Sequence, residues 1–124
     1  MEYKKITTSR TTYLPSQLEH SENIKASPEM LLEIKEGVYF LVNNDVIVYV
    51  GKSVNIAKRI ISHIEKGDKS FSDMFFIEVN GWERHKLETA CIKKYKPRYN
   101  IASNRDKSTI VEDKYRRILA KYNL

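Results

Sequence analysis

Side chains suited to phosphodiester hydrolysis follow one another at short spacings in the middle of this chain. Tyr39 and Tyr49 are ten residues apart, and Arg59 and His63 follow them four residues apart. A phenol or an imidazole can transfer a proton, and a guanidinium can hold the non-bridging oxygens of a phosphate. Hydrolysis of a phosphodiester needs charge neutralisation at phosphorus and a deprotonated water. The residue types and their spacing therefore indicate phosphodiester chemistry.

The two tyrosines lie in segments that predict a β-hairpin. Residues 36–43 and 46–50 are rich in apolar, aromatic and β-branched side chains, and a polar turn around Asn44 separates them. With the turn centred there, Tyr39 is expected to oppose Tyr49 across the hairpin, with both phenols on one face. The opposite face is expected to be core, formed by Val38, Phe40, Val42, Val46, Val48 and Val50.

A helix after the hairpin is expected to present Arg59 and His63 together. Ser53 is its predicted N-cap, and Gly67 is predicted to end it after Lys66. Arg59 and His63 fall on neighbouring turns, at the edge of an apolar stripe. The stripe is predicted to contain Ile56, Ala57, Ile60, Ile61 and Ile64.

A third strand over 71–79 and a second helix over 82–95 complete the predicted core. Glu88 projects within the apolar face of this helix, where an unpaired carboxylate is costly. An i, i+4 ion pair with Arg84 is one explanation, and a bound metal ion is the other. The neighbouring apolar positions are Leu87, Cys91, Ile92 and Tyr95.

The order of elements predicts a small α+β domain. We expect a three-stranded antiparallel sheet flanked by helices, with further helices in both extensions of the chain. A chain of 124 residues with 41% hydrophobic content is expected to form one such domain. It divides into an N-terminal extension (1–36), a core (37–100) and a basic C-terminal extension (101–124). Helices are predicted over 28–35 and 108–122, the latter with a capping box of Thr109 and Glu112 and apolar positions Ile110, Val111, Ile118 and Leu119.

Positive charge is concentrated in the last third of the chain. The chain has 22 Lys and Arg against 16 Asp and Glu, a net charge of +6. Such a cluster fits contacts with phosphates, and a solvated surface is the alternative. The residues concerned are Lys93, Lys94, Lys96, Arg98, Arg105, Lys107, Lys114, Arg116 and Arg117.

The ordered motifs of this chain resemble the GIY-YIG nuclease family. They are Gly37-Val38-Tyr39, Tyr49-Val50-Gly51, Arg59, Glu88 and Asn100, with valine for the family's usual isoleucine in both tripeptides. Residues 49–59 and 96–100 are similar to the form in the nuclease subunit of bacterial nucleotide-excision repair. The resemblance covers about half the chain and implies a metal-dependent DNA endonuclease.

The resemblance also implies roles for individual residues. Arg59 is the expected catalytic arginine, and Glu88 is expected to anchor one divalent ion, Mg²⁺ or Mn²⁺. Tyr39 is the expected general base, and Tyr49 is expected to order the water or the phosphate. A tyrosine of ordinary pKa is a poor base at neutral pH, so nearby cations, Lys52 and His63, are expected to favour the phenolate. His63 is also a candidate to accept or relay a proton, and a hydrogen-bonded structural histidine is the alternative. Asn100 is expected to hydrogen-bond the site.

Other functions and partners remain open at this stage. A non-cleaving nucleic-acid-binding module would use the basic last third, whereas a structural partner protein predicts no salt-sensitive DNA binding. DNA is the expected partner, with a homodimer or a second protein as further candidates; phage, mobile-element, restriction and repair settings are not separated. Cys91 is the one cysteine and no apolar run reaches membrane-spanning length, which favours the cytoplasm and no membrane partner.

Overall fold

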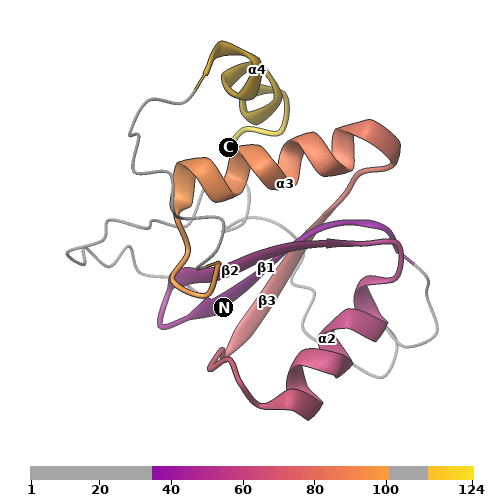
Figure 1. Cartoon of the computed structure of the whole chain (residues 1–124), viewed down its shortest axis with the longest axis vertical. Helices are drawn as coiled ribbons and strands as arrows, with labels where there is room; N and C mark the ends of the chain where they lie inside the picture. The colour runs from indigo at the N-terminus through magenta and orange to yellow at the C-terminus, as the bar shows by residue number, and fades with distance from the viewer. Residues whose placement is uncertain (1–34, 101–111) are drawn as a thin grey trace.

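The computed structural model describes residues 35–100 and 112–124 (Figure 1). The elements in these ranges confirm the predicted α+β class with a three-stranded antiparallel sheet. Most of the helix predicted over 28–35 lies outside the described residues. In chain order the elements are β1 (Gly37–Asn43), β2 (Val46–Ser53), α2 (Ile56–Lys66), β3 (Asp73–Glu78), α3 (Gly81–Tyr95) and α4 (Asp113–Lys121).

The sheet has the order β2-β1-β3 and lies between helices. In Figure 1, α2 covers one face, α3 covers the other, and α4 packs on the outer side of α3. β1 is therefore enclosed on both faces, which explains its nearly continuous apolar sequence. Five consecutive β1 side chains have no exposed surface: Val38, Tyr39, Phe40, Leu41 and Val42.

A β-bulge in β2 sets the register of the hairpin. Leu41 pairs with Tyr49 and Val42 pairs with Ile47, so Val48 is an extra residue between the two pairs. The bulge places Val48 in the cluster on the α2 side of the sheet, whereas Ile47 packs in the cluster on the α3 side. The predicted core face was therefore wrong at Val48, because strict alternation does not hold through a bulge, and Val46 is half-buried and lies outside the core cluster.

Tyr39 pairs with Gly51 rather than with Tyr49. The predicted pairing was wrong, but the two phenols do lie together, with ring centroids 6.0 Å apart. A Cβ atom on Gly51 would lie 2.5 Å from both Cζ and the hydroxyl oxygen of Tyr39. Glycine at position 51 is thus what leaves room for the Tyr39 phenol.

The ends of α2 are fixed by local hydrogen bonds. Asn55 is the N-cap, and its side-chain oxygen accepts from the backbone N–H of Lys58 at 3.1 Å. The predicted N-cap, Ser53, lies at the end of β2, where its hydroxyl accepts from the backbone N–H of Asn55. Gly67 ends the helix in the left-handed conformation, as predicted, and its N–H bonds to the His63 carbonyl.

The apolar stripe of α2 is narrower than predicted. Ile56, Ala57 and Ile60 are buried, whereas Ile61 and Ile64 are exposed. The fourth buried residue of the helix is His63. The side of α2 that faces the sheet therefore contains a titratable imidazole. A continuous apolar stripe would have an aliphatic side chain at this place.

The last two helices agree with the sequence prediction in their cores and differ at their ends. α3 begins one residue earlier than predicted, and α4 begins at Asp113 rather than at 108. Ile118 and Leu119 are buried in the cluster on the α3 side, as predicted. Thr109, Ile110 and Val111 lie outside the described residues. Within 35–100 and 112–124, the helices are all too short or too polar to cross a membrane.

Candidate active site

Four of the predicted site residues meet on the α2 side of the sheet, and we call them the phenol cluster: Tyr39, Tyr49, Arg59 and His63. They come from β1, β2 and α2. The Tyr39 hydroxyl oxygen lies 2.8 Å from Nε2 of His63. The His63 ring centroid is 5.7 Å from that of Tyr39 and 5.1 Å from that of Tyr49. The hairpin and α2 thus bring together groups up to 24 residues apart in sequence.

His63 is a neutral imidazole that shares a hydrogen bond with Tyr39 in this cluster. Burial, together with the positive charges of Lys69 and Arg59, lowers its pKa to about 4. Burial also raises the pKa of Tyr39, so the phenol stays protonated. The expectation that His63 acts as a cation favouring the Tyr39 phenolate was therefore wrong.

Arg59 is the cation that acts on the two phenols. Its guanidinium interacts with the oxygens of Tyr39 and Tyr49, which raises the pKa of Arg59 and opposes the rise in the pKa of Tyr39. Arg59 is exposed and Tyr49 is half-buried, whereas Tyr39 has no exposed surface. Solvent and substrate therefore reach Arg59 and Tyr49 first. This geometry does not favour Tyr39 as the group that contacts water directly.

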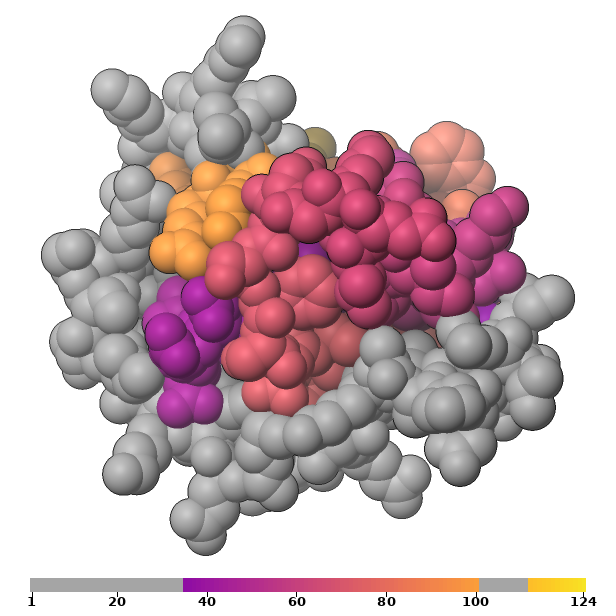
Figure 2. All heavy atoms as spheres, turned by 90° about the horizontal axis from the view of Figure 1, so that it is seen from below, coloured from indigo at the N-terminus to yellow at the C-terminus, as the bar shows by residue number. Residues whose placement is uncertain are grey.

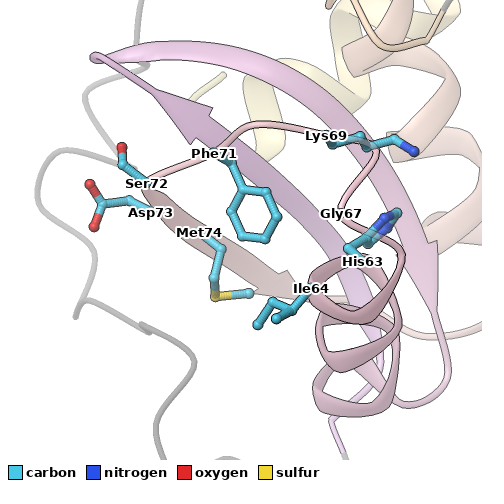
Figure 3. Close-up of a pocket in the computed structure, with 8 residues that line it drawn as sticks. All are labelled: His63, Ile64, Gly67, Lys69, Phe71, Ser72, Asp73 and Met74. Atoms are coloured by element: carbon cyan, nitrogen blue, oxygen red, sulfur yellow. The ribbon is translucent and has the colours of Figure 1, made fainter.

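A hollow of about 440 Å³ lies next to His63, between the end of α2 and the beginning of β3 (Figure 3). Apolar side chains, including those of Phe71 and Met74, form part of its wall. Lys69 lies at its rim, with Nζ 5.0 Å from the centroid of the Tyr49 ring and 3.3 Å from the Asp68 carboxylate. Lys69 thus adds a second positive charge to the phenol cluster.

A second group of charged side chains lies on the α3 side, and we call it the carboxylate cluster: Lys52, His85 and Glu88. Nζ of Lys52 is 2.5 Å from Nδ1 of His85 and 3.8 Å from Oε1 of Glu88. Burial raises the pKa of Glu88, and the positive charge of Lys52 opposes that rise. Arg84 is paired with Glu36 instead, so the ion pair with Arg84 that was the alternative explanation for Glu88 does not form.

The predicted site is therefore divided between the two faces of β2. Lys52 follows Tyr49 by three positions, and an odd separation along a strand places the two side chains on opposite faces. Lys52 contacts Glu88 rather than Tyr39, so its expected effect on the Tyr39 phenol was also wrong. The half-buried carboxylate of Glu88 fits the anchoring of one divalent ion, since such an ion keeps water ligands where carboxylates are few. Within the described residues, no group of three or more His, Cys, Asp or Glu side chains is placed to hold a metal.

Asn100 holds the edge of β2 rather than contacting the reacting groups. Its side-chain oxygen accepts from the Val50 N–H and its amide donates to the Val50 carbonyl, both at 2.9 Å. The preceding residue, Tyr99, donates its backbone N–H to the Val48 carbonyl at 3.0 Å. In Figure 2 the orange residues before position 101 lie beside the segment that leads into β3, on the face that α2 covers. Asn100 is therefore a positioning residue for the strand that carries Tyr49.

Sequence reasoning missed Gly51 and His85 as site residues. Gly51 was part of the second tripeptide, but its role depends on the register with Tyr39, which the bulge determines. His85 could have been found by its spacing, because it precedes Glu88 by three residues on the same helix. Lys69 lies in the loop after α2, where no periodic pattern distinguishes it.

Comparisons with known proteins match much of this chain. The family model for the UvrC-like GIY-YIG domain matches residues 35–101. A UvrABC system protein C from Bacteroides fragilis is 35% identical over 113 residues, which cover 80% of this chain and 18% of that protein. The corresponding protein from Mesoplasma florum is 34% identical over 87 residues, covering 62% of this chain and 15% of that protein.

Solved structures with the same domain are also similar. The GIY-YIG N-terminal endonuclease domain of UvrC from Thermotoga maritima, bound to magnesium as its catalytic divalent cation, is 26% identical. The similarity has a TM-score of 0.48 and covers 60% of this chain and 98% of that one. The chain spans less than a fifth of the length of the curated relatives it matches.

Proposed function

Because the chain belongs to the UvrC-like GIY-YIG domain family, we propose that it is a divalent-metal-dependent endonuclease that hydrolyses phosphodiester bonds in DNA. The observation that carries the proposal is the exposed Arg59 guanidinium, which interacts with both phenols of the cluster. A permanent positive charge and two hydroxyl groups at one place are what attack at a phosphate requires. DNA repair is the setting that the family resemblance favours.

Arg59 is proposed to bind the scissile phosphate. Its planar fork can donate two hydrogen bonds to non-bridging oxygens, and its charge opposes the negative charge that builds up at phosphorus. The interactions with Tyr39 and Tyr49 hold the guanidinium in place before the substrate arrives. This preorganisation is what makes a charged donor effective in the transition state.

Tyr49 is proposed to contact the attacking water. It is the half-buried phenol of the cluster, and the charges of Arg59 and Lys69 lie beside it. The buried Tyr39–His63 hydrogen bond holds together two rings that pack beside Tyr49. It thereby limits the movement of the Tyr49 side chain. In this scheme Tyr39 is a positioning residue, in place of the general base expected from the sequence.

Glu88 is proposed to anchor one divalent ion, Mg²⁺ or Mn²⁺. When bound, such an ion supplies charge neutralisation and lowers the pKa of a bound water. Lys52, which pairs with Glu88 at 3.8 Å, is placed to contact the phosphate backbone next to this position. A DNA strand that contacts both clusters would pass across the end of β2.

A supercoiled plasmid provides the test of this function. We expect the protein to convert the plasmid to the nicked form with Mg²⁺ and not with a chelator, because one site cuts one strand at a time. The variant Glu88→Gln keeps the size of the side chain and removes the carboxylate, so we expect it to bind DNA and not to nick it.

The same experiment separates the alternative function. A protein that binds the plasmid with a steep dependence on salt, but leaves it supercoiled with Mg²⁺ and with Mn²⁺, would be the non-cleaving binding module. Retained nicking by Glu88→Gln would place the metal elsewhere. Double-strand cleavage would require a homodimer or two successive nicks, and a homodimer would be detected as linear product that increases with protein concentration. A partner protein is the alternative source of target specificity.

A further inference from the structure

His85 and Glu88 share a cation in this structure. They lie three residues apart on α3, which places them on adjacent turns of the same face. The Lys52 ammonium reaches both side chains, at 2.5 Å from Nδ1 of His85 and 3.8 Å from Oε1 of Glu88. A positive charge is thus held by one imidazole nitrogen and one carboxylate oxygen.

The contact with Lys52 defines the state of the imidazole nitrogen. A lysine ammonium has three donors and no acceptor, so Nδ1 of His85 must accept with its lone pair. That lone pair is the one with which a neutral imidazole binds a metal ion. His85 is exposed, so an ion can approach it from solvent without opening the core.

We propose that His85 is a second protein ligand of the divalent ion anchored by Glu88. The inference rests on the proposed function for the anchoring role of Glu88, and it adds a nitrogen donor to a site that was expected to have a single protein ligand. Lys52 occupies the cation position in the absence of metal, and it moves toward the phosphate backbone when a divalent ion takes that position.

A nitrogen ligand has a consequence for metal preference. Mg²⁺ favours an all-oxygen environment, whereas imidazole suits transition metals, whose affinities rise from Mn²⁺ to Co²⁺ and Ni²⁺. We therefore expect the chain to bind Mn²⁺ and Co²⁺ more tightly than Mg²⁺. The variant His85→Gln should lose much of this preference while keeping the carboxylate of Glu88.

Pulsed electron paramagnetic resonance with Mn²⁺ alone, on the whole chain without DNA, tests the inference directly. A coordinated imidazole is expected to give a ¹⁴N modulation in the Mn²⁺ signal. We expect this modulation in the wild-type protein and in Lys86→Gln, a matched change at the next residue of α3, and its loss in His85→Gln. Calorimetry should show Mn²⁺ binding weakened at least about tenfold in His85→Gln, the lower end of the loss seen when a ligand's support is removed.

The outcomes distinguish this inference from the proposed function. Mn²⁺ binding that depends on Glu88 but gives no ¹⁴N modulation would overturn the role of His85 and leave the endonuclease proposal intact. A modulation that survives in His85→Gln would also overturn it, because another nitrogen would then be the ligand. A modulation that is lost with His85, in a protein that does not nick a plasmid, would support the ligand and contradict the endonuclease.

Discussion

The hydroxyl oxygen of Tyr39 and Nε2 of His63 share a hydrogen bond of 2.8 Å, and both side chains are almost completely buried. Nδ1 of the same ring has no hydrogen-bond partner within the described residues. The pair therefore combines a protonated phenol and a neutral imidazole, and it lies beside the half-buried Tyr49 and the exposed Arg59.

The burial of His63 predicts a specific dependence of stability on pH. The pKa of His63 is about 4 in the folded chain, against 6.5 for an ordinary histidine. Above pH 6.5 the imidazole is neutral in both states, and its contribution is fully present. Between pH 6.5 and 4 the unfolded chain takes up a proton that the folded chain resists, so the free energy of unfolding falls, by up to about 3 kcal/mol. We expect the variant His63→Gln to lack this part of the pH dependence in urea unfolding experiments. Parallel curves for the two proteins from pH 7 to 4 would contradict the assignment of a neutral His63.

The close approach of Gly51 to Tyr39 predicts that alanine is not tolerated at this position. The added methyl group would lie 2.5 Å from the phenol, so either Tyr39 or β2 must move. We expect Gly51→Ala to lower the free energy of unfolding by about 1–3 kcal/mol, the usual cost of overpacking, and to reduce the rate of cleavage by folded protein.

Gly67→Ala is the matched control for this change. Gly67 has a left-handed backbone and no atom within 4 Å of an added Cβ, so its substitution costs only backbone strain. We expect a loss of about 1 kcal/mol at Gly67, with cleavage by folded protein unchanged. Equal stability and equal cleavage for the two variants would show that the space beside Tyr39 is not critical.

The two hydrogen bonds of Asn100 predict a stabilising role. Asn100→Ala leaves both the N–H and the carbonyl of Val50 without their partner. We expect the free energy of unfolding to fall by about 1–3 kcal/mol, the cost of leaving buried polar groups unsatisfied. Asn80→Ala, at an exposed asparagine whose side chain makes no capping bond, should change it much less. A similar loss in the free energy of unfolding for Asn100→Ala and Asn80→Ala, measured by urea unfolding, would contradict a stabilising role for the Asn100 hydrogen bonds to β2.

Local patterns in the sequence predict much of this fold. The polar turn around Asn44, Gly67 after the helix and the apolar run of β1 predict the hairpin and the end of α2. The register of the hairpin could not be predicted from the sequence. The bulge depends on which face of the sheet Val48 packs against, and the local sequence does not determine that face. The turn spans Asn44 and Asp45 and shifts the register by one residue, and the bulge shifts it by one more, so the partner of Tyr39 is Gly51 and not Tyr49.

The candidate site was predictable in its members but not in its grouping. Arg59 and His63 were expected to lie together, and they do, but the burial that makes His63 neutral depends on the whole sheet. Lys52 was expected beside Tyr39, whereas the direction of its side chain along β2 places it beside Glu88. The sequence identifies polar residues that lie near the site. Only the packed structure determines which of these side chains contact one another.

Part of the positive charge in the last third of the chain is engaged in local contacts. Lys114 and Arg116 are paired with acidic neighbours, and Lys93 stacks on Tyr115 between the two helices. In Figure 1, α4 is separated from α2 by α3 and the sheet. The cations that lie at the phenol cluster are Arg59 and Lys69.

The single-turnover rate of Arg59→Lys tests the central claim most directly. Lysine keeps the positive charge and loses the planar fork, so we expect DNA affinity to change little while cleavage falls by roughly two to three orders of magnitude, the scale of losing one transition-state donor. Lys58→Arg, at the preceding exposed residue of α2, is the matched control and should leave both quantities unchanged. That result would assign Arg59 to the phosphate in the transition state. Rates for Arg59→Lys and wild type within a few-fold of each other would contradict the account, because Arg59 would then be one more surface cation.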